Sequence, residues 1–212
     1  EGTAAFDALD PSQQDSLLAL RQGVRDAAAR IVERFAASLR DKYLWLLGET
    51  IAAEVLAGGW TTTDGRVMGR APGYRLQPHT DSAHYGATCL FYLSDAPTPE
   101  DGALALFRPA VIPEVRDAST YYPQKAEGIE LSLVKTIPVL RNLFIAFVSG
   151  PSSVHGYERK STSSVAWRFA YQCHIVPRIL DMREIGARLP ETHRSRWMRY
   201  LPDASPDAKP SM

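Results

Sequence analysis

The middle of the chain is a series of short apolar segments separated by Gly, Pro, Asp and Ser, and this pattern restricts the fold more than any other feature. After Gly58 the chain contains RVMGR, YRLQPHT, GATCLFYLSD, ALALFRP, LSLVKTI, NLFIAFV and SVAWRFAYQCHIV. Segments of this length, rich in β-branched and aromatic residues and bounded by turn residues, predict strands. So many short strands in succession predict an all-β sandwich or barrel.

Helices are predicted in the part of the chain that precedes the strands. Asp10 is a good N-cap residue, and Pro11 suits the first position of a helix. Apolar residues then recur at helical spacing, which predicts an amphipathic helix over roughly residues 11–40. A second helix is predicted over DKYLWLLGETIAAEVL, and it ends at Gly58-Gly59.

The chain is therefore expected to have three parts: N-terminal helices over 1–58 that pack on the barrel, a β core over 59–177, and short helices with a tail over 178–212. Its 212 residues, 45% of them apolar, are enough for one domain with a sizeable core. The segment 110–130 is longer than a usual loop, which favours a functional lid; the alternative is a surface insertion.

Composition argues against several classes of partner. Lys plus Arg and Asp plus Glu both number 24, so there is no bulk electrostatic reason to expect nucleic acid or an anionic membrane. No apolar run approaches the roughly 18 residues of a membrane span, and the acidic opening EGTAAFDALD lacks a signal-peptide pattern. The only two cysteines form no CxxC motif, so a reducing cytoplasm is the expected compartment.

A candidate metal site begins with His79 and Asp81, in the segment GYRLQPHTDSAHYG. Residues two apart on a strand point to the same face, so an imidazole and a carboxylate are directed to one point. His155, which follows the apolar segment NLFIAFV and a Gly-Pro turn, is the best candidate for a third ligand. Two histidines and one carboxylate suit non-haem Fe(II), while three protein ligands also suit catalytic zinc.

Arg168 is the most informative charge, because it lies inside the otherwise apolar segment SVAWRFAYQC. A charge in such a strand is costly unless it is paired. An anionic ligand inside the barrel explains it better than an exposed sheet edge does. Strand alternation then directs Gln172 and His174 inward as well. The chain contains no GxSxG, which argues against a hydrolase triad.

The pattern PHTD…FYLSD…DGALALFRP…SVHG…WRFAY resembles the Fe(II)/2-oxoglutarate-dependent dioxygenases, and its layout is most similar to the prolyl-4-hydroxylase-like branch. The resemblance covers roughly residues 66–177. It implies a mainly β fold, the double-stranded β-helix or jelly roll, with N-terminal helices packed on one sheet. His79, Asp81 and His155 are implied to bind Fe(II).

The same resemblance implies that Arg168 pairs with the distal carboxylate of 2-oxoglutarate and that Tyr92 donates a hydrogen bond to it. Many members place the basic residue closer to the second histidine. Arg159 and Lys160 are closer here, but they lie in the polar turn ERKSTSS, where we expect solvated charges. We therefore assign the role to Arg168. Gln172 is expected beside the co-substrate.

The implied reaction uses molecular oxygen to hydroxylate a C–H bond of a small polar metabolite or natural-product intermediate, with release of succinate and CO2. The alternatives are a peptidyl-prolyl hydroxylase, a cupin-like metal enzyme of another class, and a non-catalytic jelly-roll binding module. Candidate substrate contacts are His84, His174, Tyr121 and Tyr122. The sequence predicts neither the substrate itself nor the oligomeric state.

Overall fold

The computed structural model describes residues 7–63, 65–82, 84–96, 98, 101–112, 120–159, 167–178 and 182–198. The strands in these ranges are β1 (Trp60–Thr62), β2 (Arg66–Arg70), β3 (Arg75–Asp81), β4 (Ala87–Tyr92), β5 (Leu104–Pro109), β6 (Thr120–Tyr121), β7 (Leu131–Ile137), β8 (Phe144–Val148), β9 (Val154–Glu158) and β10 (Arg168–Pro177). The helices are α2 (Pro11–Arg34), α3 (Ala36–Leu47), α4 (Glu49–Ala57), α5 (Pro123–Glu127), α6 (Met182–Arg188) and α7 (Glu191–Met198).

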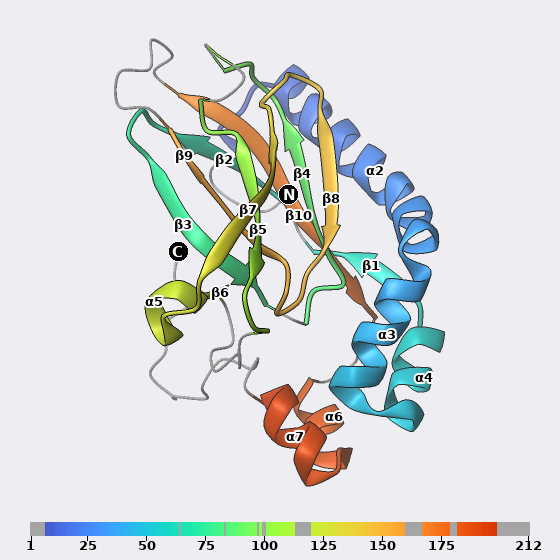
Figure 1. Ribbon diagram of the computed structural model, residues 1–212. Coiled ribbons are helices and arrows are strands. Elements are labelled where there is room, and N and C mark those ends of the chain that lie inside the picture. Colours follow the sequence, from blue (N-terminus) through green and yellow to red (C-terminus); the bar gives the residue numbers. More distant parts are fainter. Residues whose placement is uncertain are drawn as a thin grey trace.

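The strands form two five-stranded antiparallel sheets (Figure 1). One sheet has the order β1-β10-β4-β8, with β2 also paired to β10, and the other has the order β6-β3-β9-β5-β7. Apart from β5, β6 and β7, which all belong to the second sheet, successive strands from β2 to β10 alternate between the sheets, which is the winding of a double-stranded β-helix. The predicted jelly roll is therefore confirmed.

Three apolar cores hold the layers together. Tyr92, Leu104, Val139, Ile145 and Ala170 fill the space between the sheets. Helix α2 lies along the sheet that contains β4 and β10 (Figure 1). Its Val24 and Ala28 share an apolar core with residues of these two strands. The third core joins α3 and α4 to residues of the α6 region, so helices from both ends of the chain share it.

The helix boundaries differ from those expected. Asp10 caps α2 as predicted, because its side chain accepts a hydrogen bond of 3.0 Å from the backbone N–H of Gln13. The first predicted helix is broken at Phe35, so α3 begins at Ala36. The second predicted helix is also broken, at Gly48, whose φ of 72° ends α3 before α4 begins. Glycine adopts this left-handed conformation without the steric cost of a Cβ atom.

Three strands were not predicted, namely β1, β6 and β9. β1 and β6 have only three and two residues, and β9 contains a glycine and a glutamate in place of an apolar run. The expected lid, 110–130, includes β6 and α5, while its residues 113–119 lie outside the described part of the chain. Among the described residues, no helix combines the length and the hydropathy that crossing a membrane requires.

Candidate metal centre

The two candidate histidine ligands lie on neighbouring strands, His79 on β3 directly opposite His155 on β9. The register of this pair shifts between Leu76 and His79, where Pro78 has no N–H to donate to a ladder. Gly156 permits the close approach, because a Cβ atom there would lie 2.8 Å from the Leu76 carbonyl oxygen. The irregularity thus brings the two imidazole rings to a centroid separation of 4.3 Å.

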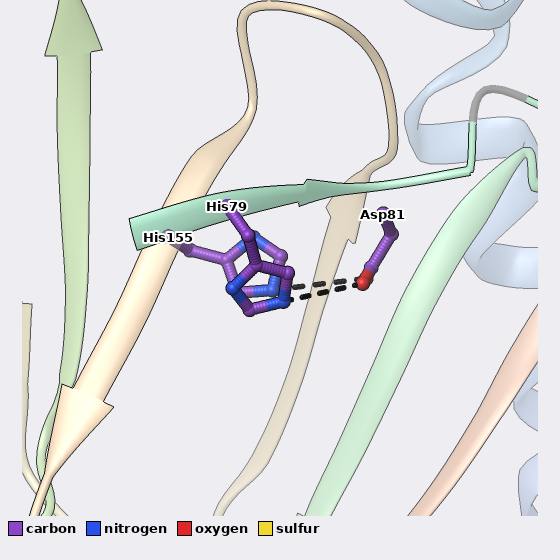
Figure 2. Close-up of side chains that lie close together, drawn as sticks. All are labelled: His79, Asp81 and His155. Carbon is purple, nitrogen blue, oxygen red and sulfur yellow. Dashed lines mark ion pairs between the residues drawn. The ribbon is translucent and has the colours of Figure 1, made fainter. Parts of the chain in front are cut away.

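Asp81 completes a group of three (Figure 2). Its two carboxylate oxygens lie 3.5 Å from His79 Nε2 and 3.7 Å from His155 Nε2, and the candidate ligand atoms are all within 4.8 Å of one another. His79 and His155 are only 4% and 5% exposed. The three side chains converge on one point, as the spacing of His79 and Asp81 predicts.

Hydrogen bonds orient both rings toward that point. His79 Nδ1 donates to the Gln77 carbonyl at 2.9 Å, and His155 Nδ1 donates to the Ser153 carbonyl at 3.0 Å. Each Nε2 therefore keeps a lone pair directed at Asp81, which is the arrangement of metal-binding histidines. Burial lowers the pKa of His155, although Asp81 opposes this, so the ring remains neutral near pH 7.

The carboxylate of Asp81 is held by a hydrogen bond from a neighbouring hydroxyl group. Thr88 Oγ1 donates to Asp81 Oδ2 at 2.6 Å, and Thr88 Oγ1 accepts from Ser149 Oγ at 2.8 Å. Burial raises the pKa of Asp81, but the neighbouring His79 and His155 rings and the hydrogen bond from Thr88 outweigh it and hold the pKa well below its usual range. Two imidazole nitrogens and one ionised carboxylate fit a divalent metal such as Fe(II) or Zn(II).

A cavity of about 190 Å³ opens beside the three ligands. Its walls come from the inward faces of β2, β4 and β10, together with β3, β9 and Tyr122. Arg168, Tyr92, Gln172 and Tyr122 all line it, so four of the predicted co-substrate and substrate residues face the same space as the metal ligands. The ring of Tyr122 lies 5.8 Å from that of His79.

Arg168 is almost fully buried in the wall of this cavity. Its Nη1 donates to the carbonyls of Asp101, at 3.1 Å, and Gly102, at 2.5 Å. Gly102 has a φ of 73°, and a Cβ atom there would collide with the guanidinium. The rings of Tyr92 and Tyr157 lie 5.5 and 5.2 Å from the guanidinium carbon. The side chain is thus positioned to meet an anion in the cavity.

Other predicted contacts lie elsewhere. The ring of His174 stacks on that of Tyr85, with 3.8 Å between the ring centroids, and its Nδ1 is 3.3 Å from Thr88 Oγ1. His174 therefore contacts the threonine that hydrogen-bonds Asp81, and it is not among the described residues that line the cavity. His84 is buried outside the lining, and its carbonyl accepts from Tyr43 of α3. Tyr121 belongs to β6, but its side chain lies outside the described part of the structure.

The expectation that Arg159 is solvated is wrong. It is 1% exposed, its Nη2 lies 3.2 Å from Asp101 Oδ2, and its Nη1 donates to the Arg70 carbonyl. A buried carboxylate explains why this charge is inside the protein. Lys160 lies outside the described residues.

Sequence reasoning missed the contribution of β2 to the cavity. Arg66, Met68 and Arg70 alternate along RVMGR and all line it. The alternation of long side chains was visible in the sequence, but it did not reveal which face points inward. Thr88 was also missed, because nothing near it in the sequence indicates that it reaches Asp81.

Comparisons with known proteins give partial likenesses. No protein-family model matches the chain, and no curated protein does. A solved prolyl-4-hydroxylase from Pseudomonas putida is 17% identical at a TM-score of 0.39, over 59% of this chain and 57% of that one. HygX from Streptomyces hygroscopicus, solved with iron bound, is 18% identical at a TM-score of 0.38, over 58% of this chain and 61% of HygX. A prolyl 4-hydroxylase from Phytophthora capsici is 16% identical at a TM-score of 0.34, over 66% of this chain and 44% of that protein.

The chain therefore covers less than two thirds of the length of each of these three proteins. HygX has also been solved with nickel, 2-oxoglutarate and hygromycin B bound. At these TM-scores the likeness is limited, and the fold and the metal centre described above stand on the geometry of the chain itself.

Proposed function

We propose that the protein is an Fe(II)- and 2-oxoglutarate-dependent oxygenase that hydroxylates a C–H bond of a small polar molecule. One observation carries the proposal: the group His79, Asp81 and His155 opens onto a cavity whose wall also contains the buried Arg168. A metal alone does not explain why a guanidinium is buried in the wall of its cavity. A co-substrate that binds the metal at one end and carries a carboxylate at the other does.

Each residue then has a definite task. His79, Asp81 and His155 hold the metal and leave positions free on the cavity side. Arg168 pairs with the distal carboxylate of 2-oxoglutarate, and the Tyr92 hydroxyl donates to the same group. Burial raises the pKa of Tyr92, although the charge of Arg168 opposes it, so the hydroxyl keeps the proton that it donates. Leu76, Leu90 and Leu104 line the cavity with apolar surface that limits water.

When bound, the metal and 2-oxoglutarate supply the oxidation by molecular oxygen, with succinate and CO2 as co-products. The volume of about 190 Å³ supports a small substrate. Tyr122, which precedes α5 and lies beside His79, is placed to contact that substrate. A peptidyl proline and a metal reaction without oxidation are the alternatives that the test must separate.

The test is succinate formation by purified protein supplied with Fe(II), oxygen and 2-oxoglutarate. Small metabolites, amino acids and proline-containing peptides are added in parallel. We expect succinate that depends on Fe(II) and increases with the true substrate, and none from protein loaded with Zn(II). Protein that binds Fe(II) but forms no succinate with any addition would contradict the proposal and favour a non-oxidative metal enzyme.

A further inference from the structure

The cavity has an unusual excess of positive charge on one pair of strands. β2 and β10 pair so that Arg70 lies directly opposite Arg168 and Arg66 lies directly opposite Gln172. All four side chains line the cavity. Like charges directly opposed across two strands are destabilising, so a pair of facing arginines is expected only where something else compensates for it.

The co-substrate does not provide enough negative charge for the whole cavity. Three arginines line it, and Asp81 is the only carboxylate among the described lining residues. A divalent metal and a dianionic 2-oxoglutarate cancel each other. Two positive charges remain, and a cleft lined by charge of one sign attracts ligands of the opposite sign. An anionic second ligand would pair them.

The three arginines differ in how they are held. Arg168 is fixed by backbone carbonyls, and the guanidinium carbon of Arg70 lies 4.5 Å from the ring of Tyr74 and 5.7 Å from that of Tyr157. Arg66 is exposed, and no residue in the described part of the chain pairs with it through a hydrogen bond or a salt bridge. It is therefore the arginine that is free to meet an incoming ligand.

Arg66 also lies toward the metal end of the cavity. Gln172, opposite Arg66, is two residues from His174, which contacts Thr88 beside Asp81. Burial lowers the pKa of His174 to about 4, and the charge of Arg66 contributes to that decrease while Asp81 opposes it. The charges of Arg66 and Asp81 thus act on the same ring in opposite directions.

We propose that the substrate is a small organic anion and that Arg66 binds its carboxylate beside the metal centre. This inference rests on the proposed function, since it requires 2-oxoglutarate to occupy Arg168. A planar guanidinium pairs with a carboxylate through two parallel hydrogen bonds, which both holds and orients the substrate. Arg66 therefore determines specificity, and neutral analogues of the substrate bind weakly.

Equilibrium dialysis of the protein loaded with Fe(II) and 2-oxoglutarate without oxygen tests the inference. The probes are small carboxylic acids, from acetate to the N-acetyl amino acids, each paired with its primary amide. We expect acids to bind and their amides to bind about ten-fold or more weakly, the ratio set by one or two charge-assisted hydrogen bonds. Arg66→Gln should remove that preference, and Arg66→Lys should restore part of it.

Arg108→Gln is the matched control, because Arg108 is an exposed strand arginine that does not line the cavity. It should bind acids as the wild type does. Equal binding of acids and amides, no binding by any acid, or an Arg66→Gln variant that loses 2-oxoglutarate instead of the acid would overturn the inference. Failure of the wild type to bind 2-oxoglutarate would contradict the proposed function instead, and the same acid–amide pairs measured with Fe(II) alone would still decide the role of Arg66.

Discussion

The two faces of β10 show how one strand serves stability and chemistry at once. Tyr171, Cys173 and Ile175 point outward and pack with α2 in an apolar core. Arg168 and Gln172 point inward and line the cavity. Because side chains alternate along a strand, a shift of a single position moves a residue from one role to the other. Substitutions on the two faces should therefore affect different measurements.

The largest expected effect lies on the outward face. Ile175→Ala removes a side chain that is 0% exposed in the core beneath α2. We expect the free energy of unfolding to fall by about 2–5 kcal/mol, from lost burial and from the cavity that remains. Denaturant unfolding measures it. The control is Phe169→Ala on the same face. Phe169 is 43% exposed, so its loss should lower the free energy of unfolding much less.

Folded Ile175→Ala protein should still bind Fe(II) with nearly unchanged affinity. If Ile175→Ala weakened Fe(II) binding as strongly as it weakened folding, the two faces would not be independent, and the comparison would fail.

The inward face should give the opposite result. Arg168→Ala removes charge-assisted hydrogen bonds to the co-substrate, worth about 1.5–3 kcal/mol each. We expect the KM for 2-oxoglutarate to rise about ten-fold or more, since 1.4 kcal/mol corresponds to one decade. Succinate formation at varied 2-oxoglutarate measures it, with Arg108→Ala as the control. The same signature from Arg159→Ala, and not from Arg168→Ala, would transfer the role to the arginine that pairs with Asp101.

An effect of similar size, on metal binding, is expected from Thr88, which contacts the ligand Asp81. Thr88→Val keeps the shape of a fully buried side chain but removes the hydrogen bond to Asp81. Fe(II) affinity should fall by roughly 10–100-fold, as is typical when a partner of a metal ligand is lost. The matched control is Thr80→Val, a buried threonine on the opposite face of β3. An equal loss of affinity in the control would show that general packing, and not the Asp81 contact, is responsible.

Local patterns were enough to predict most of the strands and the convergence of His79 with Asp81. Both depend on alternation within one segment. The sequence also indicated Arg168, because a charge in an apolar strand is informative wherever that strand lies. These predictions needed no knowledge of which strands are neighbours.

What the sequence did not reveal depends on contacts between distant segments. Arg159 was wrongly expected in solvent because its partner, Asp101, is far away in the chain. Arg66 was missed because its place opposite Gln172 comes from the β2–β10 register. The strand that carries His155 was missed because Gly156, which the close approach to β3 requires, interrupts the apolar pattern.

The account depends most on the metal centre, and an oxygen-free titration with Fe(II) tests it directly. Wild-type protein and Arg168→Ala should each bind one equivalent of Fe(II) per chain with similar affinity, because Arg168 lies outside the ligand group. Asp81→Ala, which removes the one carboxylate ligand, should remain folded and lose tight Fe(II) binding. Wild-type affinity in folded Asp81→Ala protein would contradict the assignment of His79, Asp81 and His155 as the metal centre.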